Sequence, residues 1–181
     1  STAHKCDVSN EDEVKRFRDD VLEQHGRDSV NRLFNNAGIG SGVSFVDGDR
    51  TEWERTFNIG WSGVYYCARA FIPHLVAADE AHMINTSSVN GFWASLGPGS
   101  THTAYSAAKF AVKGFTEALV TDFRINAPHV KVSVVMPGHI GTSIAINSGK
   151  ISGHAEPMAM SDDEVDQIRA RIEQRQGIDL S

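Results

Sequence analysis

The sequence contains 181 residues, of which 40% are hydrophobic and 22% charged, and its formal net charge is −6. These values are typical of a globular domain, and they leave no basic surplus to neutralise the phosphates of a nucleic acid. No apolar run approaches the ~18 residues of a membrane span, and the first nine residues contain no apolar signal core. We therefore expect a cytoplasmic protein with neither a nucleic-acid nor a membrane partner.

The cysteine and histidine patterns also exclude several classes of site. Cys6 and Cys67 do not form a CxxC pair, and the eight histidines form no HExxH or HxH pattern. We therefore expect no disulfide framework and no metal site.

In chain order, helical and strand patterns alternate. A helix is expected over 11–26 with Ser9 at its start, and a second one runs through 53–75 with Thr51 as its cap. The other predicted elements are strands at 30–38, 82–89 and 130–138, a helix at 103–124, a loop from 142 to about 160 and a last helix at 161–177. The alternation predicts an α/β fold, a doubly wound, Rossmann-like parallel sheet with helices on both faces, in one domain over 1–181.

Small and polar residues follow the three predicted strands. Asn35–Gly38, Thr86–Val89 and Pro137–Thr142 stand at the strands' carboxyl ends, and in parallel sheets ligands bind outside those ends. The sequence therefore predicts a site along this rim.

Each rim motif also has an ordinary structural interpretation. NNAG is a common strand-ending turn, SSV at a strand end is unspecific, and PGHIGT contains a simple strand stop. Tyr105 and Lys109, in HTAYSAAKFAV, stand four residues apart, a spacing that occurs by chance in many helices. The order of these motifs on one rim is what favours a catalytic site.

With NNAG, the serine pair, YxxxK and PGxIxT in this order, the sequence resembles the main soluble branch of the short-chain dehydrogenase/reductase family. The resemblance extends from Cys6 to the loop after Thr142. It implies an oxidoreductase that interconverts an alcohol and a carbonyl by hydride transfer with NAD or NADP. The family slightly favours NADP, and the residue that decides is not in this sequence.

The resemblance assigns four catalytic positions. Tyr105 is the general acid/base; a model tyrosine has a pKa of about 10, and a neighbouring cation such as Lys109, on the same helix face, favours the phenolate. Lys109 also holds the nicotinamide ribose, Ser88 binds the substrate oxygen, and Asn58 holds a water for proton relay.

The resemblance also assigns a cofactor surface. Asp7 and Val8 would flank the adenine, and Ile140 and Thr142 would face the carboxamide. The complete set implied is Asp7, Val8, Asn36, Ala37, Gly38, Tyr105, Lys109, Pro137, Gly138, Ile140 and Thr142.

The sequence departs from the family's pattern in the Ser88–Tyr105 interval, at His139 and at the phosphate-binding turn. The interval between Ser88 and Tyr105 is long, which predicts an insertion within 91–101 near the substrate. The family's phosphate-binding glycine turn is missing, because AGIGSGV lacks the last glycine of GxGxxG and precedes a polar loop. We expect that two βα units, roughly 50–60 residues, and the C-terminal end are absent from this chain, so that the strand at 30–38 has a bare apolar edge.

The alternative to an active oxidoreductase is a truncated or non-catalytic member of the family that acts as a binding or oligomerisation module.

The resemblance finally predicts partners. Helices near 52–75 and 105–124 would form a homodimer or homotetramer interface. The loop at 143–160 would line the substrate site, and Phe92, Trp93, Ile144 and Met158 suggest an apolar alcohol or carbonyl.

Overall fold

The computed structural model describes residues 1–40, 42–94, 101–138, 144 and 148. The chain divides into two compact units, Ser1–Thr142 and Ser143–Ser181. In the second unit, the Ser148 hydroxyl donates to the carbonyl oxygen of Ile144 at 2.6 Å. The rest of the predicted substrate loop and the whole predicted last helix lie outside the described residues.

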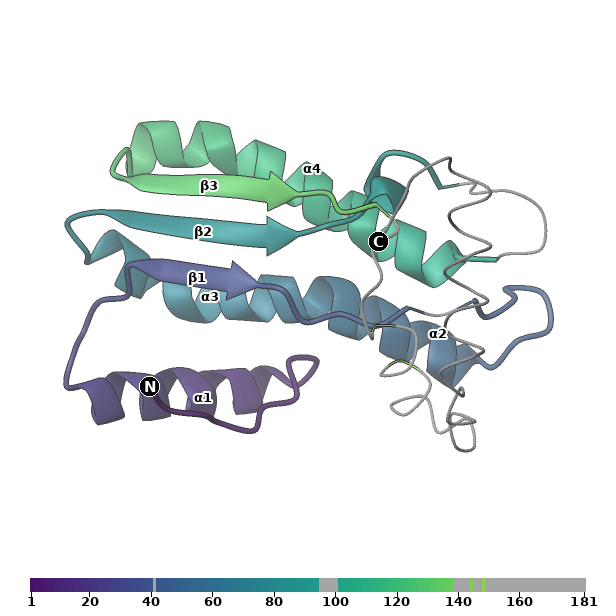
Figure 1. Cartoon of the computed structure of the whole chain (residues 1–181), viewed down its shortest axis with the longest axis horizontal. Helices are drawn as coiled ribbons and strands as arrows, with labels where there is room; N and C mark the ends of the chain where they lie inside the picture. The colour runs from purple at the N-terminus through teal and green to yellow at the C-terminus, as the bar shows by residue number, and fades with distance from the viewer. Residues whose placement is uncertain (41, 95–100, 139–143, 145–147, 149–181) are drawn as a thin grey trace, which may run out of the picture. The chain divides into compact units, whose positions relative to one another are not determined.

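The first unit is built around a parallel sheet of three strands (Figure 1). Its elements are α1 (Glu11–His25), β1 (Arg32–Asn35), α2 (Arg50–Phe57), a π-helical turn (Asn58–Ser62), α3 (Gly63–Val76), β2 (Ala81–Thr86), a 3-10 turn (Val89–Gly91), α4 (Thr103–Asn126) and β3 (Val130–Val135). The strand order is β1-β2-β3, with parallel pairing throughout. This arrangement confirms the predicted Rossmann-like α/β fold.

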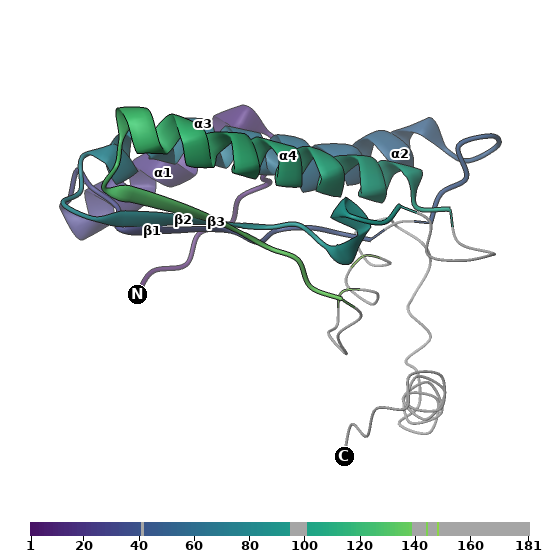
Figure 2. The ribbon, with the colours of Figure 1, turned by 90° about the horizontal axis from the view of Figure 1, so that it is seen from above.

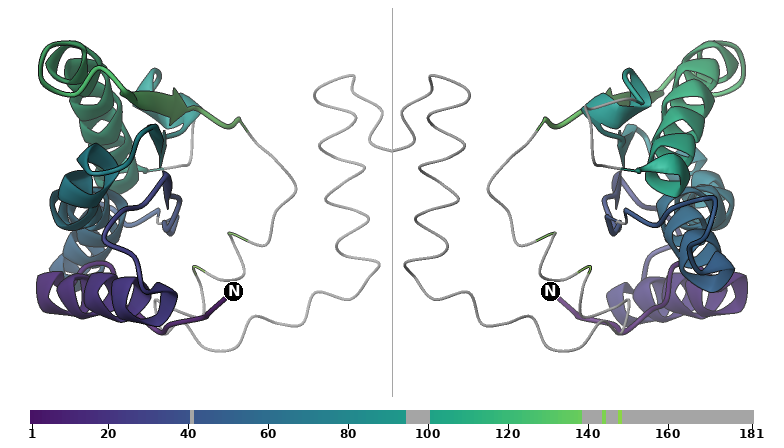
Figure 3. Two further views of the ribbon diagram at one scale, coloured as in Figure 1. Left: turned by 90° about the vertical axis from the view of Figure 1, so that its left-hand side faces the viewer. Right: turned by 90° about the vertical axis from the view of Figure 1, so that its right-hand side faces the viewer.

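The described helices cover one face of the sheet. Figures 2 and 3 show α3 and α4 on the same side of the strands. On β1, Leu33 and Asn35 are buried on this side, whereas Phe34 points away and keeps 64% of its surface exposed. A doubly wound sheet has helices on both faces, and the described residues supply only one of these layers.

The hydrophobic core lies between the sheet and these helices. It includes Val14 of α1, Leu75 of α3 and Met83 of β2, all fully buried. The Phe17 and Phe71 rings, 5.7 Å apart and edge to face, join α1 to α3. Among the described helices, none is long and apolar enough to cross a membrane.

The caps of two helices differ from the prediction. Asn10, rather than Ser9, caps α1, because its side-chain oxygen accepts from the amides of Asp12 and Glu13 at 3.0 and 3.2 Å. The Ser9 hydroxyl instead donates to Asp7 at 2.7 Å. At α2, Asp49 is the cap, and it accepts from the amide of Thr51 at 2.8 Å.

The predicted helix over 53–75 is interrupted by the π-helical turn Asn58–Ser62. Two glycines allow neighbouring elements to approach closely there. A Cβ at Gly60 would lie 3.0 Å from that of Ala108, and one at Gly63 would lie 2.8 Å from Cγ2 of Val8. We infer that this packing, which residue periodicity does not reveal, accompanies the change in helical pitch.

A chain of hydrogen-bonded, buried polar side chains connects β1 and β2 to α4. Asn35 and Asn85 are register partners on β1 and β2, and Nδ2 of Asn35 donates to Oδ1 of Asn85 at 2.8 Å. Nδ2 of Asn85 then donates to the hydroxyl of Thr116 on α4 at 2.9 Å. The Thr116 hydroxyl donates to the carbonyl oxygen of Val112 at 2.6 Å. These bonds fix both the strand register and the position of α4.

We predict that Asn85→Ala lowers the free energy of unfolding by about 2–4 kcal/mol, because it leaves the buried amide of Asn35 without its acceptor. Denaturant unfolding measures the change. Asn31→Ala is the matched control, because the Asn31 amide donates to the carbonyl oxygen of Glu80 at an exposed position, and it should cost at most about 0.5 kcal/mol. Equal losses in the two variants would contradict the role of the buried chain.

Candidate active site

The carboxyl ends of β2 and β3 form the floor of the predicted rim. The Ser87 amide donates to the carbonyl oxygen of Val135 at 2.8 Å, and the Val89 amide donates to that of Pro137 at 3.0 Å. A Cβ at Gly138 would lie 3.9 Å from Cγ1 of Val89. Pro137 and Gly138 therefore lie directly beside the turn that carries Ser88.

Tyr105 and Lys109 lie on successive turns of α4. Nζ of Lys109 is 5.5 Å from the centre of the Tyr105 ring, and the Lys109 residue is only 4% exposed. The ammonium donates to the carbonyl oxygen of Thr86 at 2.8 Å, and a Cβ at Gly38 would lie 3.5 Å from Nζ. Three predicted residues, Gly38, Tyr105 and Lys109, thus come together at the ends of β1 and β2.

Burial governs the charge of the lysine. It lowers the pKa of Lys109 to about 8, because the protein interior disfavours the charged form. The lysine therefore titrates far closer to neutral pH than an exposed one.

Ser88 begins the 3-10 turn after β2 and is 7% exposed. Its oxygen accepts from the backbone amide of Asn90 at 3.2 Å. Its hydroxyl faces the side-chain oxygen of Asn90 at 3.5 Å.

Asn58 is set apart from this group. It is exposed and begins the π-helical turn, and its side-chain oxygen accepts from the Ser62 hydroxyl at 3.2 Å. Within the described part of the chain, no hydrogen bond joins Asn58 to Ser88, Tyr105 or Lys109. Its helix reaches α4 through the close approach of Gly60 to Ala108.

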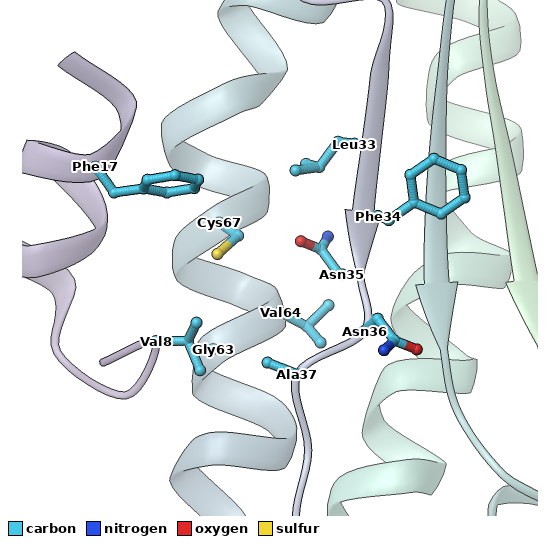
Figure 4. Close-up of a pocket in the computed structure, with 10 residues that line it drawn as sticks. All are labelled: Val8, Phe17, Leu33, Phe34, Asn35, Asn36, Ala37, Gly63, Val64 and Cys67. Carbon is cyan, nitrogen blue, oxygen red and sulfur yellow. The ribbon is translucent and has the colours of Figure 1, made fainter. Parts of the chain in front are cut away.

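A second group of predicted residues lines a cavity of about 110 Å³ between β1, α3 and the segment before α1 (Figure 4). Val8, Asn36 and Ala37 belong to its lining, together with Gly63 and Cys67. Burial raises the pKa of the Cys67 thiol to about 11, so the thiol stays neutral. Among the described strands, β1 has no partner on this side, so the expected open edge borders this cavity.

Of the other predicted positions, the described Asp7 joins neither group. The carboxylate of Asp7 is exposed and accepts from the amide of Ser9 at 2.9 Å. Ile140 and Thr142 lie outside the described residues, as does most of the predicted insertion within 91–101.

Sequence reasoning missed residues that hold the site together. The carbonyl of Thr86 binds the lysine, and the Thr86 hydroxyl donates to Oδ1 of Asn36 at 3.0 Å. The Ser87 hydroxyl donates to the carbonyl oxygen of Lys109 at 2.7 Å, and Asn90 is buried beside Ser88. The available signal was a run of polar residues directly after an apolar strand.

We predict that Lys109 contributes a rise with pH to the free energy of unfolding of the cofactor-free protein between about 8 and 10.5, which the raised pKa of the Cys67 thiol opposes from about 9 upward. In this window the unfolded lysine keeps its proton while the folded one releases it, so the unfolded state binds more protons. Lys109→Met abolishes this rise. At neutral pH it stabilises the protein by about 1–3 kcal/mol, the relieved burial penalty exceeding the lost bond to Thr86.

Denaturant unfolding on both sides of the window measures this effect. Lys113→Met is the matched control, because Lys113 lies one turn further along α4 and pairs with Glu117 at 2.7 Å. A Lys109→Met variant with the wild-type rise would contradict the assignment.

Comparisons with known proteins find similar sequences and similar folds. The family model for short chain dehydrogenases matches residues 1–151. The chain is 36% identical over 149 residues to "Putative oxidoreductase SadH" of Mycobacterium tuberculosis, covering 82% of this chain and 52% of the relative. It is 32% identical over 157 residues to a 3-ketodihydrosphingosine reductase of Bacteroides thetaiotaomicron, covering 86% and 55%. The chain thus spans about half the length of these curated relatives.

Solved structures show the same likeness. A short chain dehydrogenase/reductase from Burkholderia phymatum in complex with NAD aligns with a TM-score of 0.74 and 31% identity, over 96% of this chain and 60% of that one. A metagenomic short-chain oxidoreductase in complex with NADP aligns with a TM-score of 0.65 and 30% identity, over 86% and 69%. Together with the family match, these findings show that the chain belongs to the short-chain dehydrogenase/reductase family.

Proposed function

We propose that the protein is a nicotinamide-dependent oxidoreductase in which Tyr105, Lys109 and Ser88 perform the proton chemistry between an alcohol and a carbonyl. The observation that carries this proposal is the buried lysine, whose ammonium faces the Tyr105 ring at 5.5 Å. Burying a cation costs free energy. Two similar proteins were solved in complex with NAD and NADP, and binding such a cofactor would account for a buried lysine.

The residues present are suited to the nicotinamide side of the cofactor. A lysine ammonium has three N–H donors, and one of them is used by the carbonyl of Thr86. The others are suited to the hydroxyls of a ribose. Gly38, with no side chain beside the ammonium, leaves room for that sugar. The same fit serves NAD and NADP.

The bound cofactor would supply or accept the hydride, and side chains of the protein would donate or accept the proton. During reduction, Tyr105 donates its phenolic proton to the carbonyl oxygen and is reprotonated from solvent. During oxidation, Tyr105 first releases its proton to solvent, and the resulting phenolate accepts the alcohol proton. Ser88 donates a hydrogen bond to the same oxygen and stabilises its developing negative charge. Lys109 orients the ribose, and Asn58 holds a water for the proton relay.

The substrate that we propose is an apolar ketone or alcohol. Phe92 and Trp93, directly after the turn that carries Ser88, are 65% and 70% exposed. Phe92 also packs under the ammonium of Lys113, 4.7 Å from its ring centre. The Bacteroides thetaiotaomicron relative is named as a 3-ketodihydrosphingosine reductase, a name that gives a ketone as its substrate.

We predict that the whole protein enhances the fluorescence of NADH or NADPH and oxidises one of them in the presence of acetophenone or cyclohexanone. Tyr105→Phe removes the transferable proton and lowers kcat at least about 100-fold, while nucleotide affinity changes by less than about threefold. Tyr66→Phe is the matched control and keeps wild-type turnover. Turnover retained in Tyr105→Phe would contradict the role of Tyr105, and no nucleotide response in the wild type would contradict the function.

We also propose that α3 and α4 join two copies of the chain. Tyr65 on α3 and Phe110 on α4 remain 39% and 44% exposed, and apolar surface on adjacent helices is typical of an oligomer interface.

Tyr65→Glu and Phe110→Glu should each weaken this association at least about tenfold, because a charge is desolvated in the interface. Analytical ultracentrifugation measures the dissociation constant. Val46→Glu, in a loop position that is 95% exposed, should leave association unchanged. A wild-type protein that stays monomeric would contradict the proposed interface.

A further inference from the structure

The turn after β2 contains a buried polar side chain to which the proposed chemistry assigns no task. Asn90 is 4% exposed and lies in the middle of the 3-10 turn Val89–Gly91. A buried amide is costly unless its donors and acceptor are used. Its partners therefore indicate what it does.

Those partners are Ser88 and Ser106. The backbone amide of Asn90 donates to the Ser88 oxygen at 3.2 Å, and the Ser88 hydroxyl donates to Oδ1 of Asn90 at 3.5 Å. On its other side, Nδ2 of Asn90 donates to the hydroxyl of Ser106 at 3.4 Å. Ser106 directly follows Tyr105 on α4. One side chain thus connects Ser88 to the helix that carries Tyr105.

The backbone of this turn is fastened to the same helix. The Ser87 hydroxyl donates to the carbonyl oxygen of Lys109 at 2.7 Å. A Cβ at Gly91 would lie 2.8 Å from that oxygen and 2.4 Å from Oγ of Ser87, so only glycine fits. With the backbone fixed, the main freedom left to Ser88 is rotation of its own side chain.

We propose that Asn90 is a positioning residue that sets the orientation of the Ser88 hydroxyl relative to Tyr105. Its backbone amide occupies one acceptor site of the Ser88 oxygen. Its side-chain oxygen holds the Ser88 proton through a bond of 3.5 Å, which is long and therefore weak. A substrate oxygen can replace this bond at little cost. Asn90 thus holds the Ser88 side chain in one orientation, and it leaves the Ser88 proton able to turn to a substrate oxygen.

The catalytic part of this inference rests on the proposed function, whereas the orientation of Ser88 does not. The competing explanation is that Asn90 only stabilises the fold. In that case its removal would lower stability and leave Ser88 in place. A double-mutant cycle separates the two explanations, because a residue that acts through Ser88 has no effect once the Ser88 hydroxyl is gone.

The test uses the whole protein with acetophenone or cyclohexanone and the preferred nicotinamide cofactor. We expect Ser88→Ala to lower kcat about 100-fold or more and Asn90→Ala to lower it about tenfold, with an unchanged KM for the cofactor. The double variant should match Ser88→Ala alone. Ser106→Ala, which removes only the far anchor of the amide, should give a smaller loss than Asn90→Ala.

Ser133→Ala is the control. It removes a half-buried hydrogen bond to His82 of 2.8 Å, and it should keep the wild-type kcat. A tenfold effect of Asn90→Ala that persists in the Ser88→Ala background would overturn the proposal.

A crystal structure of Asn90→Ala gives a readout that does not require activity. We expect the Ser88 side chain to occupy a different rotamer or more than one. A single, unchanged Ser88 rotamer in this variant would overturn the proposal even if the wild type shows no turnover. Absent turnover combined with a displaced Ser88 would instead reject the proposed function and keep the positioning role of Asn90.

Discussion

The buried hydrogen bonds from Asn35 through Asn85 to Thr116 are the constraint on which the site depends. The apolar pattern of a half-buried strand excludes a slip by one residue, which would turn the buried side chains to the other face. An amide that faces an amide across two strands also excludes longer slips, because its hydrogen bonds are satisfied in one register only. This register decides which of the residues that follow β1 and β2 face each other at the rim. It places Asn36 beside Thr86, and the carbonyl of Thr86 within 2.8 Å of Lys109. The buried polar chain therefore determines the position of the Thr86 carbonyl, which accepts the hydrogen bond of Lys109.

Lys109 shows how the fold accepts an unfavourable group at the site. Burial disfavours its charge, as its lowered pKa indicates, and the single carbonyl of Thr86 offsets only part of that cost. The surrounding contacts hold the lysine in place nonetheless. The Ser87 hydroxyl binds its carbonyl oxygen, and Gly91 packs on its backbone at a distance that excludes any side chain. We expect an apolar residue to be more stable than lysine at this position, a cost in stability that is typical of functional sites.

The sequence allowed the β/α alternation, the strands and the extent of α4 to be predicted, because these follow from periodicity and from small polar residues at strand ends. The interruption at Asn58–Ser62 could not be predicted, because it accompanies contacts of Gly60 with Ala108 and of Gly63 with Val8 that are distant in sequence. The cap of α1 was displaced by one residue, because Ser9 and Asn10 both have capping side chains and Asp7 engages Ser9. The candidate catalytic residues were recognisable from motifs, whereas the contacts of Thr86 and Asn90 could be found only in the folded chain.

The two sides of the rim differ in how firmly they are fastened. At the junction of β2, β3 and α4, backbone bonds from Ser87 and Val89 tie the turn to β3, while the side chains of Ser87 and Asn90 tie it to α4. Beside β1, the described residues leave an open strand edge, an exposed Phe34 and a cavity. Proton transfer requires hydrogen-bond distances set to within tenths of an ångström. The groups proposed for it lie where the chain is held by hydrogen bonds to both β3 and α4. The proton chemistry can therefore be precise at this junction even though the β1 side is more open.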